Sequence, residues 1–95
     1  MIISKTFSDK LKQIHALSKN INGKSTKKHT KKLLKMIKEH AKEIELLQKD
    51  NNSHFLTETG DLIVLCMELL EEYNVSIDET LGKCCKRFEN KLNAL

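Results

Sequence analysis

A stripe of apolar side chains that recurs every three or four residues constrains this chain more than any other feature. That spacing follows the 3.6-residue period of an α-helix, so the side chains share one face that must be buried. The stripe predicts an amphipathic helix over about residues 28–49. Its members are Leu33, Leu34, Ile37, Ala41, Ile44 and Leu47.

Three further helices are expected on either side of this stripe. The first runs from about Ser8 to Asn20 and ends at residues 20–23, whose Asn and Gly suit a left-handed C-cap. A Lys/Ser/Thr stretch follows, which we expect to be mobile. Residues 50–53 break the second helix, and the third helix spans about His54 to Tyr73. The fourth begins at Ser76, where Ser76-Ile77-Asp78-Glu79 has the pattern of a capping box.

Composition favours the same fold class. The chain has no Pro, three Gly and 4% aromatic residues, which is too few turn and aromatic residues for a sandwich or barrel. We therefore predict one all-α domain over residues 1–95, a four-helix, bundle-like fold whose residues 1–26 form an N-terminal helix and a mobile loop. Because so small a domain buries little apolar surface, we expect a homo-oligomer, a dimer or tetramer, to complete the core.

The cysteines and the apolar runs bear on location. Cys66, Cys84 and Cys85 are odd in number and two are adjacent, so they do not predict a disulfide framework. Reduced thiols are typical of a cytoplasmic chain, which is our expectation. The apolar run from Leu62 ends at Glu68, well short of the length that spans a membrane, so we predict no membrane segment.

Charge is unevenly distributed along the chain. Residues 1–50 contain 13 lysines and 5 acids, whereas residues 51–95 contain 4 basic residues and 8 acids. The lysines between residues 24 and 38 form either a solvated helix face or a surface that attracts anions. No aromatic residue lies among them, so a base-stacking surface is not indicated. A nucleic-acid-binding protein that uses residues 24–38 is the last of our hypotheses, because no recognition helix with base-reading residues stands out.

Two carboxylates at the edge of the apolar third helix are the first candidates for chemistry. Glu58 and Asp61 are three residues apart and share a helix face. Carboxylates beside a buried helix are costly unless neutralised, and Mg²⁺ takes carboxylate oxygens while keeping waters for a phosphate. Gly60 inside a helix costs about 1 kcal/mol relative to Ala, which suggests a close approach there. The alternative is an ordinary exposed pair of acids.

A second acidic set lies on the preceding helix. If the two helices pack antiparallel, Glu39 or Glu43 approaches Glu58 and Asp61, and facing carboxylates then require a cation. The alternative is that Glu39 and Glu43 face solvent and pair with lysines.

The last helix adds basic side chains at Lys83, Arg87 and Lys91. Arg87 and Lys91 are four residues apart, so they share a face and could clamp phosphate oxygens. An ordinary basic surface is the alternative.

Three segments, taken in order, resemble the MazG-like nucleotide pyrophosphohydrolases. Residues 58–63, Glu-Thr-Gly-Asp-Leu-Ile, resemble the E-x-G-D-L-L segment of that family. Residues 75–81 are similar to its turn and helix start, and residues 86–92 to its basic and aromatic ending. The resemblance covers about residues 33–92, and the order and spacing of the segments make it more specific than any one of them.

The resemblance implies an activity and a set of roles. Members of the family cleave a nucleoside triphosphate to the monophosphate and pyrophosphate, using Mg²⁺ held by an EExxE and an ExxD motif. Glu58 and Asp61 would then be metal ligands, and Arg87 and Lys91 would contact the phosphates. We expect Glu39 and Glu43 to join the metal ligands, Glu39 and Glu58 to be the catalytic carboxylates, and Lys83 to bind the substrate as well. The expected cofactor is Mg²⁺, with Mn²⁺ as a possible substitute, and the expected partner is a nucleotide.

The first motif departs from the family pattern, and two registers stay open. A gapless alignment sets residues 38–42, Lys-Glu-His-Ala-Lys, against EExxE and keeps Glu39. A shift by one residue keeps Glu43 and places His40 at a ligand position. The lysines that replace family glutamates favour a second hypothesis, a catalytically inactive MazG-like module that binds a nucleotide or regulates a partner protein.

Overall fold

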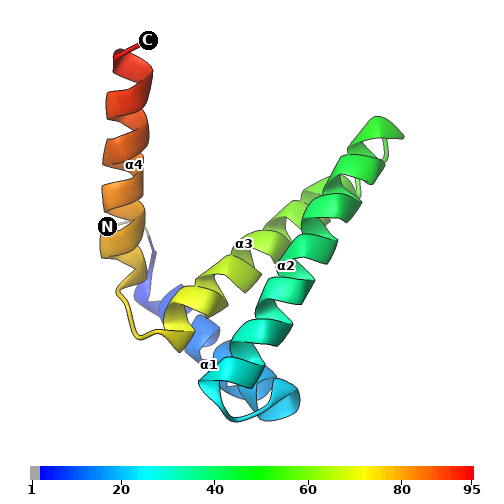
Figure 1. Cartoon of the computed structure of the whole chain (residues 1–95), viewed down its shortest axis with the longest axis vertical. Helices are drawn as coiled ribbons and strands as arrows, with labels where there is room; N and C mark the ends of the chain where they lie inside the picture. Colours follow the sequence, from blue (N-terminus) through cyan, green and yellow to red (C-terminus); the bar gives the residue numbers. More distant parts are fainter. Residues whose placement is uncertain (1–2) are drawn as a thin grey trace.

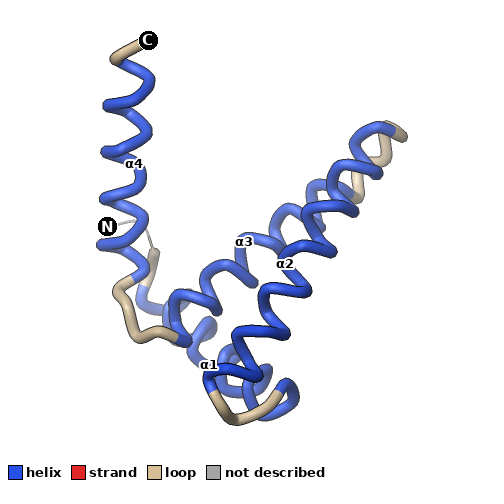
Figure 2. The backbone as a smooth tube through the Cα atoms, viewed as in Figure 1, coloured by secondary structure: helices blue, strands red, loops and turns tan. Residues whose placement is uncertain are grey.

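The computed structural model describes residues 3–95 and folds them into α-helices joined by short loops (Figures 1 and 2). This confirms the predicted all-α, bundle-like class. No helix within residues 3–95 combines the length and the apolar character needed to cross a membrane. The helices are α1 (Lys5–Asn22), α2 (Thr26–Lys49), α3 (Phe55–Glu72) and α4 (Ile77–Asn93).

Serine side chains cap three of the helices. The hydroxyl of Ser4 accepts from a backbone N–H at the start of α1, that of Ser25 does the same for α2, and that of Ser76 for α4. Such a cap satisfies one of the N–H groups left free at a helix start. The Ser76 cap is the one that the sequence predicted.

The loop between α1 and α2 is shorter than expected. Gly23 ends α1 with φ of 130°, and α2 already begins at Thr26 because Ser25 caps it. The predicted loop up to residue 26 was therefore too long by one residue, since Thr26 already belongs to α2. Only residues 23–25 lie between the two helices.

The core lies where three helices meet. Helices α2 and α3 form an antiparallel hairpin, and α1 packs across the end of it where α2 begins and α3 finishes (Figure 1). The buried apolar side chains are those of Leu11, Leu33 and Leu65, one from each helix. They share the interior with His29, Glu68 and Glu72, so the core is both small and unusually polar.

Helix α4 leaves the end of α3 and projects away from the hairpin (Figure 1). None of its residues is buried, and the apolar side chains of Phe88 and Leu92 are 56% and 68% exposed. The backbone N–H of Ile3 donates to Asp78 Oδ1 over 3.3 Å, which ties the N-terminal segment to the start of α4. Within residues 3–95, the apolar side chains of Phe88 and Leu92 on α4 are therefore left uncovered.

Candidate functional site

His40, Glu58 and Asp61 come together where α2 and α3 face each other, and we call them the hairpin cluster. One ligand atom of each residue lies within 4.8 Å of the others. His40 Nε2 is 3.3 Å from one carboxylate oxygen of Glu58, and His54 Nε2 is 3.3 Å from the other. His40 and Glu58 are half-buried and Asp61 is exposed, so the cluster is open to solvent on one side.

The ring of His40 is held in a defined orientation. Its Nδ1 lies 2.9 Å from the backbone oxygen of Met36, one turn earlier on α2. A carbonyl oxygen only accepts, so Nδ1 carries the proton and donates it. Nε2 is then the atom that faces Glu58. Metal-binding histidines are commonly oriented by such a bond at the second ring nitrogen.

The hairpin cluster contains two of the four carboxylates that the sequence suggested. Glu58 and Asp61 lie together on α3, and the residue that α2 contributes is His40. Glu39 and Glu43 of α2 are exposed and lie outside the cluster. Of the two registers, the shifted one had placed His40 at a ligand position. Only one residue in three or four of α2 can face α3, because successive side chains point in different directions around the helix. His40 occupies such a position, whereas Glu39 and Glu43 do not.

Gly60 does not mark a close approach. A Cβ atom built on Gly60 would meet no heavy atom within 4 Å of it outside the local helix backbone. The expectation that its small size admits a neighbouring group was therefore wrong. A glycine inside a helix lowers its stability, and nothing in the packing around Gly60 explains why a glycine is present there.

The basic residues of α4 lie apart from the hairpin cluster. Lys83, Arg87 and Lys91 are exposed, and the charged groups of Arg87 and Lys91 lie 5.4 Å and 6.0 Å from the centre of the Phe88 ring. Since α4 projects away from the hairpin, one chain does not bring these residues to Glu58 and Asp61 (Figure 1).

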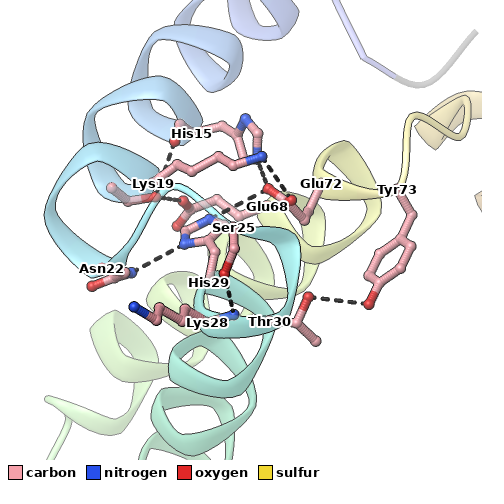
Figure 3. Close-up of polar contacts among 11 residues, drawn as sticks. His15, Lys19, Asn22, Ser25, Lys28, His29, Thr30, Glu68, Glu72 and Tyr73 are labelled. Carbon is pink, nitrogen blue, oxygen red and sulfur yellow. Dashed lines mark hydrogen bonds and ion pairs between the residues drawn. The ribbon is translucent and has the colours of Figure 1, made fainter.

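A second polar group lies where α1 crosses the end of the hairpin, and we call it the junction cluster (Figure 3). Glu72 accepts hydrogen bonds from His15 Nε2 and from Lys19 Nζ, each over 2.8 Å. Ser18 donates to Glu68. This group was not predicted from the sequence, although the position of His15 among the apolar residues of α1 was a signal for it. The cluster comprises His15, Ser18, Lys19, Asn22, His29, Glu68 and Glu72.

The charges in the junction cluster are set by burial and by direct hydrogen bonds. Burial alone raises the pKa of Glu72, but hydrogen bonds from Lys19, Thr26 and His15 outweigh it and lower the pKa to about 2. Burial lowers the pKa of His29 below its usual 6.5, against the opposing charge of Glu72. At neutral pH, Glu72 is therefore an anion and His29 is uncharged.

The lysines of α2 line an open hollow on the outer face of the hairpin. Its volume is about 650 Å³, and Leu34 supplies part of an apolar floor. Of the two interpretations offered by the sequence, this hollow favours an anion-attracting surface. It is lined by Asn22, Lys28, Lys31, Lys32, Leu34, Lys35 and Lys38.

The thiols of Cys66, Cys84 and Cys85 are free, as the sequence predicted. Comparison with known proteins found no matching family model, no matching curated protein and no matching solved structure.

Proposed function

We propose that this chain is a divalent-metal-dependent nucleoside triphosphate pyrophosphohydrolase, with its cation held by the hairpin cluster. The observation that carries the proposal is the convergence of His40, Glu58 and Asp61 from two facing helices, with ligand atoms within 4.8 Å of one another. The choice of reaction rests on the resemblance of residues 58–63 to the ExxD segment of MazG-like enzymes, which cleave nucleoside triphosphates to the monophosphate and pyrophosphate.

The donor set suits a divalent cation that accepts both oxygen and nitrogen. Two carboxylates would satisfy Mg²⁺, but the imidazole of His40 makes Mn²⁺ the better match, because Mg²⁺ strongly prefers oxygen ligands. A cation bound there would neutralise the phosphates of the substrate and activate a water molecule. Glu58 already lies between His40 and His54, so its carboxylate is oriented before any ligand arrives.

The surroundings of the hairpin cluster favour a polyanionic substrate. Lys35 and Lys38 lie on the same helix as His40 and belong to the lysine-lined hollow. Their positive charge raises the local concentration of a nucleotide around α2. Asp61 is exposed, so the hairpin cluster is accessible from solvent.

We further propose that the enzyme is a homo-oligomer. The apolar face of α4, with Phe88 and Leu92, has no partner within the described part of one chain. A second copy would cover this face, and the same docking would bring Arg87 and Lys91 of one chain towards the hairpin cluster of another. There they would contact the phosphates, as the family resemblance implies.

A specific observation favours a second candidate, a catalytically silent nucleotide-binding or regulatory module. Glu39 and Glu43 are exposed and lie outside the hairpin cluster. Each chain therefore offers one imidazole and two carboxylates, with no additional carboxylate to take a proton from water.

A nucleotide panel distinguishes the two candidates. The full chain is incubated with each NTP and dNTP in the presence of Mn²⁺ or Mg²⁺, and the release of pyrophosphate is measured. We expect Mn²⁺-dependent release that falls at least about 100-fold in Asp61→Asn, because an amide replaces an anionic ligand. Glu45→Gln is the matched control, since Glu45 is a highly exposed acid on α2 that pairs with Lys49 and lies outside the hairpin cluster.

The other outcomes are equally informative. Nucleotide binding by calorimetry without any product selects the silent module. Product release that survives in both variants contradicts a role for the hairpin cluster.

A further inference from the structure

We propose that His15, His29 and Glu72 form a second, buried metal site, which takes a transition-metal ion of the Zn²⁺ or Co²⁺ kind and fastens α1 to the hairpin. The three side chains come from α1, α2 and α3 and meet at the junction cluster (Figure 3). This inference does not depend on the pyrophosphohydrolase proposal, because the two clusters share no residue.

The distances suit one ion between the three ligand atoms. Glu72 Oε1 lies 2.8 Å from His15 Nε2 and 3.9 Å from His29 Nε2. All three ligand atoms are within 4.8 Å of one another. A tetrahedral ion with bonds of about 2.0–2.2 Å holds its ligand atoms about 3.3–3.6 Å apart. The two distances fall on either side of that range, so small side-chain rotations would complete the geometry.

The side chain of His29 is a second, independent observation that indicates a bound ligand. Its side chain is 0% exposed, and within residues 3–95 its Nε2 has no hydrogen-bond partner. A buried polar atom without a partner is costly, because it has lost its hydrogen bond to water and gained none in return. Nε2 is the atom closest to Glu72 Oε1, so it is aimed at the position that the ion would occupy. Coordination would remove this cost.

The surroundings hold both rings in place, and each histidine would release a proton from Nε2 when it binds the ion. Asn22 Nδ2 lies 3.3 Å from His29 Nδ1 and donates to it, which fixes the ring with Nε2 towards Glu72. Glu72 is ionised, and Lys19 bonds to Oε2, which leaves Oε1 facing the histidines. Two imidazole nitrogens and one carboxylate oxygen are a common donor set for Zn²⁺.

A metal ion can reach the junction cluster from solvent, and an ion bound there would link α1 to the hairpin. A shallow hollow of about 360 Å³ is lined in part by His15 and Lys19, and the side chain of His15 is 16% exposed. This hollow is a route for the ion. Because the apolar core is small, an ion shared by three helices would stabilise the position of α1 substantially.

Co²⁺ titration tests the proposal in a chain that carries His40→Ala and Asp61→Asn, so that the hairpin cluster cannot contribute. We expect one Co²⁺ per chain, with the visible absorption of a tetrahedral ion, and a higher melting temperature when Zn²⁺ is added. Adding His15→Ala lowers the affinity at least about tenfold. His54→Ala is the matched control and leaves the affinity unchanged, since His54 lies outside the junction cluster.

Lys19→Met keeps the proposal testable should His15→Ala disturb folding. Removing the ammonium group destabilises the metal-free chain, but it also removes a competing charge beside Glu72, so we expect Co²⁺ to bind more tightly. A background chain that binds no Co²⁺ would overturn the proposal, as would unchanged affinity in a folded His15→Ala variant or weaker binding in Lys19→Met. The junction cluster would then be an ion-pair network only.

Discussion

Glu72 is a carboxylate whose side chain is 0% exposed, yet it stays ionised because His15 and Lys19 bond to it directly. Removing charge from water is costly, and only paired, hydrogen-bonded partners make a buried anion tolerable. This residue therefore links the stability of the α1–α3 contact to pH.

Acid should weaken the fold through Glu72. Because its pKa is about 2 in the folded chain against an ordinary 4.5, its stabilisation is complete above 4.5 and is lost as the pH falls through about 2. The loss is at most on the order of 3 kcal/mol. Urea unfolding at a series of pH values measures it. In Glu72→Gln, the free energy of unfolding is lower at neutral pH and depends less on pH between 4.5 and 2.

An equally steep acid dependence in Glu72→Gln would show that other groups carry the effect.

Glycines make the sharpest prediction at the scale of the helices. Gly60 lies in α3 with open space around its absent side chain, whereas Gly23 ends α1 with φ of 130° and would place a Cβ 2.9 Å from Lys28 Cβ. Gly60→Ala should raise the free energy of unfolding by about 0.5–1 kcal/mol, because Ala loses less backbone entropy in a helix. Gly23→Ala should lower it, through strain and steric clash. Chemical denaturation of the two variants beside the parent chain measures both effects.

Equal signs for the two glycine variants would contradict this account of the helices. The two positions differ in backbone conformation and in the space available, and that difference is the whole basis of the prediction.

The helices themselves were predictable from sequence, since apolar spacing, caps and breakers act over a few residues. The stripe from Leu33 to Leu47 predicted α2, and Ser76 and Gly23 were correctly identified as helix boundaries. The start of α2 was predicted two residues late because Ser25 was not recognised as a cap. Local signals thus fixed the elements to within a few residues.

The two clusters were less accessible, because they depend on how helices rotate against each other. Sequence spacing put Glu58 and Asp61 on one face of α3, but it could not decide which face of α2 would meet them. In the folded chain, the packing of α2 against α3 places His40 beside these two carboxylates. The junction cluster combines residues up to 57 positions apart in the chain, so no local pattern predicts it.

At the scale of the whole molecule, the projecting α4 is the feature that calls for a partner. Sedimentation equilibrium should give a mass that is a multiple of the 11.0 kDa chain. Phe88→Ser should shift the mass towards that of one chain while keeping the helical circular dichroism, because Phe88 is 56% exposed and supports no core. Leu17→Ser, at a 66% exposed position on α1, is the matched control and should leave the mass unchanged.

A parent chain that sediments as a monomer at every concentration would contradict the oligomer. It would also remove the route by which Arg87 and Lys91 approach a hairpin cluster.

The proposed function depends on a divalent cation bound in the hairpin cluster. Crystals of the full chain soaked in Mn²⁺, with data collected near the manganese absorption edge, would reveal such an ion. We predict an anomalous difference peak bounded by His40 Nε2, Glu58 and Asp61, at bond lengths of about 2.0–2.3 Å. A map with no peak there, in which Glu58 keeps its contacts with His40 and His54, would contradict the proposed function.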